Sequence, residues 1–335
     1  MRIDCLKLSP WLLLELSFGR VRHHGRPDQR GHPRLRIVLA GYLAGRFGVL
    51  GSESAVALNR FVYFFALPAL LFAFTARAPL AKVLNWPFIA AFIGAGMLTL
   101  CIALIVGRIW FRQDFSTLSM HGLTSVYGNV TYMGVPLLLT AYGPNGVLPT
   151  IAATLAINFV FIAAGIAALE AAPATGPSTP RVISQVAGTL AVNPLLLSLL
   201  LGIVFSGLAL PLPKAIGSFL DLMSAAAGPG ALFALGLSLV ERKLMGGTVE
   251  ALWLVVLKLA IYPLLAFILV AKVFALDPLW GLAVIVLSAM PIGAGAFIVA
   301  QQYNVHVPQV SAAIVLSTAI SVFTISFLLI WLRAG

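Results

Sequence analysis

The chain has 335 residues, of which 61% are hydrophobic and only 9% are charged, and its mean hydropathy is +1.03. This composition excludes soluble and nucleic-acid-binding modules and predicts an all-α protein with many membrane-spanning helices. The net charge of +11 fits this class, because residues 1–36 hold eight Arg or Lys residues against three acids and the rest is spread over short loops. With only Cys5 and Cys101, neither a disulfide framework nor a thiol metal site is expected.

The N-terminus, residues 1–36, is atypical for such a protein. Its basic segment Val21–Arg36 ends at the apolar run IVLAGYLAGR, which is about ten residues long where a span needs about 20. One interpretation is a basic arm. The other is a shifted reading frame, because the segment read one base later, with permitted codons, encodes an apolar string that would complete the first span. The nucleotide sequence of the gene decides between them.

Apolar segments of spanning length recur along the rest of the chain, each bounded by charge, Pro or Gly. We place them at 55–75, 86–110, 116–141, 147–169, 188–208, 215–239, 250–273, 279–302 and 309–332. With the shortened segment at 36–46 they make ten expected spans. A stretch rich in Pro, Ala, Ser and Thr predicts a linker over 171–187, which divides the chain into five-helix repeats at 37–170 and 188–335.

The two halves are expected to form a 5+5 inverted repeat, because an odd number of spans makes the second half enter the membrane from the opposite side. They also share local patterns. ALPALLFA (Ala66–Ala73) corresponds to GPGALFAL (Gly228–Leu235), and SVYGNVTYMGVPLL (Ser125–Leu138) corresponds to SAMPIGAGAFIVA (Ser288–Ala300). The second pair predicts two broken helices at equivalent places of the repeat.

A helix can be broken at membrane depth only where protein or a watery cavity satisfies the freed backbone groups. Each break ends one half-helix and begins another, whose N–H groups attract anions. Glycines allow close approach of a ligand, Pro136 suits the first turn of a half-helix, and Asn129 offers an uncharged donor and acceptor. The candidate substrate-binding residues are Gly128, Asn129, Gly134, Pro136, Pro291, Gly293 and Gly295. The alternative, in which they only kink, cap and pack helices, stays open.

These residues also carry a family resemblance. GNVTYMGVPLLLTAYG (Gly128–Gly143), AMPIGAGAFIVAQQYNV (Ala289–Val305), LNRFVYFFALPALLF (Leu58–Phe72) and NPLLLSLLLG (Asn193–Gly202) resemble the auxin efflux carrier family, whose bacterial members include malonate and malate permeases. The similarity covers residues 37–332. It implies a ten-helix crossover fold like that of sodium/proton antiporters and bile-acid symporters. Spans 1, 2, 6 and 7 would form a scaffold, and spans 3–5 and 8–10 a moving unit. The fourth and ninth spans would cross at the substrate site, with Asn129, Pro136 and Pro291 as its foremost residues.

Ionisable groups at membrane depth are functional candidates. Lys258 lies centrally in ALWLVVLKLAIYPLL, His121 near the start of the fourth span, and Asp221 early in the seventh. Lys258 could balance the substrate's charge or pair with the carbonyl end of a helix, or it could snorkel or make a structural hydrogen bond. His121 could relay protons or be a hydrogen-bonded residue at a helix end. Asp221 could couple transport, or it could cap a helix or pair near the interface. Neither break contains an acid, which weakens the case for a sodium site. Proton coupling, sodium coupling and uniport stay open.

The predicted function is secondary active transport of small organic anions, mono- or dicarboxylates, by alternating access in the bacterial inner membrane. A channel or facilitator is the alternative. The sequence has no His-Glu-x-x-His motif, paired membrane aspartates or Ser/His dyad, so an enzyme is not expected. No cofactor, metal or nucleic acid is expected. The expected partners are the substrate anion, the bilayer and a proton or sodium ion, and a homodimer is left open.

Overall fold

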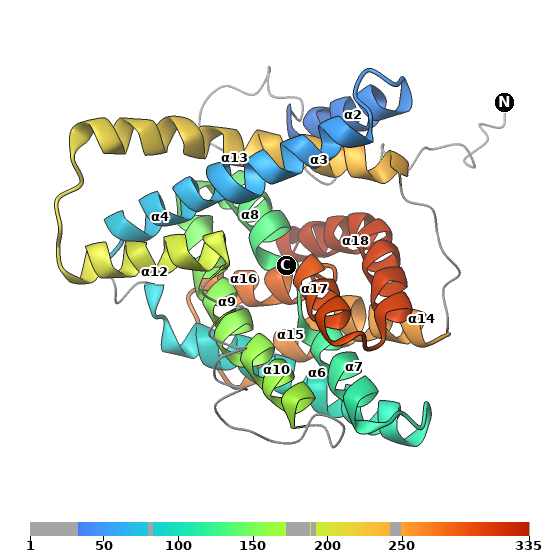
Figure 1. Ribbon diagram of the computed structural model, residues 1–335. Coiled ribbons are helices and arrows are strands. Elements are labelled where there is room, and N and C mark those ends of the chain that lie inside the picture. The colour runs from blue at the N-terminus through green and yellow to red at the C-terminus, as the bar shows by residue number, and fades with distance from the viewer. Residues whose placement is uncertain (1–32, 80–82, 172–187, 189–191, 242–248, 335) are drawn as a thin grey trace, which may run out of the picture.

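The computed structural model describes residues 33–79, 83–171, 188, 192–241 and 249–334, and all regular elements in these ranges are helices or helical turns. Figure 1 shows the arrangement. The predicted linker lies outside the described residues from residue 172 on, as does the atypical N-terminus up to residue 32. The linker and the shifted reading frame therefore stay predictions.

The helices follow one another with few long connections. The first half contains α2 (Pro33–Arg46), α3 (Ser52–Phe61), η1 (Val62–Ala66), α4 (Leu67–Arg77), α6 (Trp86–Ile109), α7 (Phe115–Val126), η2 (Val130–Gly134), α8 (Val135–Tyr142), η3 (Gly143–Gly146), α9 (Val147–Ala156), η4 (Ile157–Ile162) and α10 (Ala163–Glu170). The second half contains α12 (Pro194–Gly207), α13 (Lys214–Glu241), α14 (Val249–Val256), η5 (Leu257–Ile261), α15 (Tyr262–Lys272), α16 (Pro278–Ser288), α17 (Ala294–Tyr303) and α18 (Val307–Ala334).

Six helical stretches among the described residues are long and apolar enough to cross a membrane: Glu53–Arg77, Trp86–Ile109, Val130–Glu170, Lys214–Ala234, Val249–Lys272 and Val307–Ile325. The apolar helices α12 and α16 are shorter. The prediction of an all-α membrane protein is thus confirmed. The stretch from Val130 to Glu170 covers the later part of the expected span 116–141 and the whole of 147–169, and it turns at Gly143, whose φ is +66°. The division into ten spans stays a prediction.

Three π turns have a clear cause in the sequence. The turns η1, η2 and η5 each end two residues before a proline, at Pro68, Pro136 and Pro263. Proline has no N–H group, and its ring collides with the carbonyl four residues earlier. In each case that carbonyl lies within the π turn, where the wider backbone gives the ring room. The helix therefore continues through the proline.

Buried apolar side chains form two cores. One is built mainly from η1, α4, α12 and α13, with Ile151 and Leu155 of α9 packed against them. The other is built from α6, α7, α10 and α14 to α18, again with part of α9. Helices α2, α3 and α4 lie along α13 on one side of the molecule (Figure 1). The two predicted helix breaks, between α7 and α8 and between α16 and α17, lie where these groups of helices meet.

Candidate functional site

The two helix breaks meet each other. The backbone N–H of Asn129 donates to the carbonyl of Pro291 at 2.7 Å, and the N–H of Gly293 donates to the carbonyl of Tyr127 at 3.0 Å. Together these bonds make an isolated antiparallel bridge centred on Gly128 and Ile292. The breaks thus satisfy part of each other's freed backbone groups, as a break at membrane depth requires.

Glycine is needed at this crossing because the chains lie so close together. A Cβ atom on Gly293 would lie 2.9 Å from Tyr127 Cε1 and 3.2 Å from the Gly128 carbonyl oxygen. A Cβ atom on Gly295 would lie 2.6 Å from Tyr127 Cζ. A side chain at either position would therefore push the two breaks apart.

A cavity of about 570 Å³ lies beside the crossing. Four of the predicted site residues line it: Gly128, Asn129, Gly293 and Gly295. The cavity lies next to Val130 and Ala294, where the half-helices η2 and α17 begin. The free N–H groups of two helix starts are thus close to one cavity.

The other predicted site residues are not part of its lining. Gly134 packs against α16, where its Cβ would lie 2.7 Å from Leu287 Cδ2, and Pro291 contributes the carbonyl that accepts from Asn129. Pro136 is buried in the first turn of α8. Because α8 continues directly from η2, the half-helix begins at Val130, not at Pro136. Pro136 thus stands in the first turn of α8, as predicted, although the broken helix already begins with η2, and its part in the substrate site stays a prediction.

Several polar lining residues were missed by sequence reasoning: Asn59, Arg60, Tyr63, Thr131, Tyr132, Thr154, Asn158, Asn193 and Thr318. Arg60 is the only charged one, and no carboxylate is found among the described lining residues. Arg60 could have been predicted from the sequence, because it lies inside the expected span 55–75 and a charged residue within a span is a functional candidate. The scattered amides and hydroxyls of the lining gave no comparable signal.

Many of these polar groups already have partners within the protein. The Tyr132 hydroxyl donates to Asn59 Oδ1, and Asn158 Nδ2 donates to the carbonyl of Thr154 at 2.8 Å. Asn129 differs, since its side chain makes no hydrogen bond to any residue that the structure describes. Its amide therefore keeps its full hydrogen-bonding capacity for a ligand.

Lys258 lies beside the crossing but does not line the cavity. Its fully buried Nζ donates to the carbonyl of Ser288, the last residue of α16, and lies 4.6 Å from the centre of the Tyr262 ring. On its other side is Gly128, where a Cβ would come within 3.1 Å of Nζ. The ammonium group thus sits at the carbonyl end of one half-helix, where the helix dipole favours a cation.

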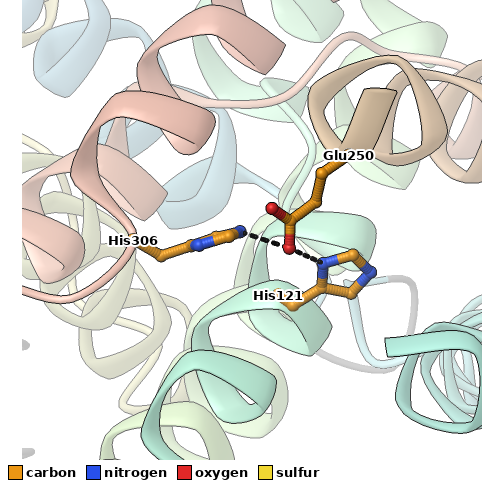
Figure 2. A group of neighbouring side chains, drawn as sticks. All are labelled: His121, Glu250 and His306. Carbon is orange, nitrogen blue, oxygen red and sulfur yellow. Dashed lines mark ion pairs between the residues drawn. The ribbon is translucent and has the colours of Figure 1, made fainter. Parts of the chain in front are cut away.

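His121 lies away from the cavity. Its side chain is fully buried, and Nδ1 lies 3.6 Å from Glu250 Oε1 and 3.1 Å from Gln113 Nε2. His306 Nε2 approaches the same Glu250 oxygen at 3.3 Å (Figure 2). Burial lowers the pKa of His306, while the Glu250 carboxylate opposes that shift. His121 therefore belongs to a separate cluster of three ionisable groups.

Asp221 also lies apart from the crossing. It is an exposed residue of α13, and its carboxylate pairs with Arg77 of α4 at 2.6 Å. Ion pairs of this exposed kind contribute little to stability. The geometry gives Asp221 no contact with the cavity lining.

Comparison with known proteins agrees with the helical architecture. The sequence profile of a family described as "Membrane transport protein" matches residues 33–329. A "Putative malonate transporter" of Rhizobium meliloti (strain 1021) is 30% identical over 308 residues, which cover 90% of this chain and 95% of that protein. An "Uncharacterized transporter" of Methanothermobacter thermautotrophicus is 28% identical, over 87% of this chain and 93% of its own length.

A more distant relative is a mouse "Lysosomal cholesterol signaling protein", which is 25% identical over 85% of this chain but only 35% of its own length. The predicted resemblance to auxin efflux carriers is confirmed by these matches, and so is the prediction that the protein is not an enzyme. With a family profile that spans nearly all of its length, the chain belongs to the membrane transport protein family and is a membrane transporter.

Proposed function

We propose that the protein is a secondary transporter of small organic anions, mono- or dicarboxylates, in a bacterial inner membrane. The cavity at the crossing carries this proposal, because its described lining contains Arg60 and no carboxylate. Arginine keeps its charge at any physiological pH and binds carboxylates through paired hydrogen bonds. A cavity of about 570 Å³ is of the size that holds small ligands.

A carboxylate in this cavity would have three kinds of partner. Arg60 supplies a full positive charge, the Asn129 amide supplies a free donor, and the starts of η2 and α17 supply backbone N–H groups. Lys258 would balance the negative charge from behind Gly128 without touching the substrate. The name of the Rhizobium relative supports dicarboxylates as the substrate class.

For the mechanism we propose alternating access in a ten-span, 5+5 inverted repeat over residues 37–170 and 188–335, of the sodium/proton antiporter or bile-acid symporter type. Two observations support it. The two breaks lie at corresponding places of the halves and bond to each other reciprocally. The two hydrophobic cores divide the helices into a group with α4, α12 and α13 and a group with α6, α7 and α14 to α18. The first group would be the scaffold, and the second would slide against it.

Uptake into liposomes tests the transport proposal. The purified protein is reconstituted, and uptake of labelled malonate, malate and an aromatic acid is measured with and without a proton or sodium gradient. We expect saturable uptake of one acid, accelerated by the same unlabelled acid inside the vesicles. Non-saturable flux without this counterflow would favour the channel or facilitator instead. A folded protein that takes up none of these acids would remove organic anions as the substrate class.

Cysteine labelling tests the inverted repeat independently of the substrate. In a Cys5→Ser, Cys101→Ser background, single cysteines are placed at Arg112 and at Ala275, in the connections after α6 and after α15. An inverted repeat puts these two connections on opposite sides of the membrane, so a membrane-impermeant thiol reagent should label only one of them in intact cells. Labelling of both from one side would rule out the proposed repeat. Whether a homodimer forms is tested separately, by the mass of the purified protein in detergent.

A further inference from the structure

A second group of polar side chains lies away from the transport cavity, and the proposed function does not use it. Figure 2 shows His121 of α7, Glu250 of α14 and His306 of the turn between α17 and α18. Their side chains converge, and one nitrogen or oxygen atom of each lies within 4.8 Å of those of the other two. His121 Nδ1 and His306 Nε2 approach the same oxygen, Glu250 Oε1, at 3.6 and 3.3 Å.

The three side chains of the cluster are almost completely buried, and some of their polar atoms lack hydrogen-bond partners. The side chains of His121, Glu250 and His306 are 0%, 16% and 4% exposed. His306 Nε2 points at the carboxylate, yet it makes no hydrogen bond to any described residue. Buried polar atoms in this condition are rare, because each one costs free energy unless a partner or an ion satisfies it.

We propose that His121, Glu250 and His306 bind a divalent transition-metal ion of the Zn²⁺ class. Two imidazoles and one carboxylate are a known donor set for zinc. Metal–ligand bonds of about 2.0–2.1 Å at tetrahedral angles place ligand atoms about 3.3–3.4 Å apart. Glu250 Oε1 lies 3.3 and 3.6 Å from the two imidazole nitrogens, and all three ligand atoms lie within 4.8 Å of one another. Ca²⁺ and Mg²⁺ fit poorly, because they require about six or more oxygen ligands.

Gln113 completes the surroundings of the ion. Its Nε2 lies 3.1 Å from His121 Nδ1 and donates to Glu250 Oε1, whereas its buried Oε1 has no hydrogen-bond partner within the described part of the chain. Rotating the Gln113 amide group by 180° would exchange the positions of Nε2 and Oε1. Oε1 would then face His121 and Glu250 and could be the fourth ligand of the ion. Gly107 of α6 leaves room for this side chain, because a Cβ there would lie 2.7 Å from Gln113 Oε1.

The ion would join helices from the two halves of the chain. It would tie α7 to α14 and to the beginning of α18, which all belong to the same hydrophobic core. None of its ligands lines the transport cavity. Its role is therefore structural: binding stabilises the folded state, and an ion that binds only the folded protein raises its unfolding temperature. This differs from the expectation that the chain binds no metal.

Metal-dependent unfolding tests the proposal. The full chain is purified in detergent with a tag that contains no histidine, treated with a chelator and unfolded by heat in the presence of Zn²⁺, Co²⁺ or Mg²⁺. The sequence also contains His23, His24 and His32, which could bind zinc themselves, so all three are changed to Gln in the starting protein. We expect Zn²⁺ and Co²⁺, but not Mg²⁺, to raise the unfolding temperature with one ion bound per chain.

The ligand variants are chosen to keep the protein folded. His306 has a φ of +60°, a conformation that Asn tolerates, so His306→Asn removes the ligand without straining the backbone. His121→Gln keeps a polar side chain of similar size in α7. Each variant should weaken Zn²⁺ binding by more than the roughly 10–100-fold that loss of an outer partner costs. Ser119→Ala, on the same helix as His121, should bind Zn²⁺ like the starting protein.

Two results would overturn the metal site. One is an unfolding temperature that saturating Zn²⁺ leaves unchanged in the starting protein. The other is Zn²⁺ binding of undiminished affinity in the His306→Asn variant. Unfolding without metal shows directly whether each variant is folded. The visible absorption of bound Co²⁺, which depends on the ligands, should disappear in both ligand variants.

Discussion

The crossing cavity and the cluster of His121, Glu250 and His306 are both polar sites in an apolar helical protein, but they use their polar groups in opposite ways. At the cavity, the Asn129 amide has no protein partner among the described residues and Arg60 is exposed. In the cluster, three ionisable side chains face one another and are at most 16% exposed. A site for a transient ligand must keep accessible hydrogen-bonding groups, whereas buried side chains that face one another suit a ligand that stays bound, such as the proposed metal ion.

The largest effect is expected from Lys258→Met, which removes the cation at the crossing but keeps most of the side-chain volume. The carbonyl of Ser288 loses its donor, and an unsatisfied buried group costs about 1–3 kcal/mol. We expect the initial uptake rate in liposomes to fall at least about tenfold, which corresponds to about 1.4 kcal/mol. A variant that is folded and transports at the wild-type rate would show that the crossing does not need this charge.

Asn129→Ala is expected to affect transport and leave stability unchanged. Because the Asn129 side chain makes no hydrogen bond to a described residue, its loss should leave the unfolding temperature as it is. The substrate concentration for half-maximal uptake should rise about tenfold, as expected when a hydrogen bond of about 1.5 kcal/mol to a charged ligand is lost.

Asn158→Ala is the matched control, because Asn158 also lines the cavity but donates to the Thr154 carbonyl. That variant should lose about 0.5–1.5 kcal/mol of stability. Unchanged transport by Asn129→Ala would remove Asn129 from the substrate site.

Gly293→Ala tests the close approach of the two breaks. The new Cβ would lie 2.9 Å from the Tyr127 ring and 3.2 Å from the Gly128 carbonyl oxygen, and overpacking of this kind costs about 1–3 kcal/mol. Uptake should fall severalfold. Gly228→Ala is the control, because Gly228 lies in α13 and a methyl group there would meet no described atom within 4 Å. Its unfolding temperature should change much less than that of Gly293→Ala, because the gain from Gly to Ala in a helix is offset by the restriction that Pro229 places on the residue before it. Equal stability of both variants would contradict the close approach.

The smallest effect on transport is expected from His121→Gln. His121 lies in the buried cluster and does not line the cavity. The initial uptake rate in the presence of a chelator should therefore stay within about twofold of the wild-type rate, which corresponds to about 0.4 kcal/mol of activation free energy. If this variant lost its proton-driven uptake but kept its stability, His121 would be a proton relay. The separation between cluster and cavity would then be wrong.

Much of the helical architecture follows from local properties of the sequence. Hydropathy alone predicts membrane helices, because every backbone group in hydrocarbon must be bonded within its own segment. The breaks at Gly128-Asn129 and at Pro291 to Gly293 were also predictable, since Gly and Pro act on the backbone where they stand. The π turns before Pro68, Pro136 and Pro263 have the same local cause, although sequence reasoning did not anticipate them.

The partners of these residues could not be predicted in the same way. Sequence reasoning treated Pro136 as the start of a half-helix and grouped His121 and Asp221 with Lys258 as coupling candidates. In the structure the half-helix begins at Val130, and Asp221 pairs with Arg77 at the surface, which was the alternative to a coupling role and did not name the partner. Whether an ionisable side chain faces a cavity, lipid or another charge depends on helix rotation and packing, which apolar periodicity leaves undetermined.

The sequence by itself determined the class of the protein, the places where two helices break, and the residue types available there. Only the tertiary structure decided that the N–H of Asn129 meets the carbonyl of Pro291, that Arg60 reaches the cavity, and that Lys258 meets the end of α16. It also decided that His121, Glu250 and His306 converge. The physical reason is that hydropathy and backbone preferences act over a few neighbouring residues, whereas these contacts depend on how whole helices pack against one another.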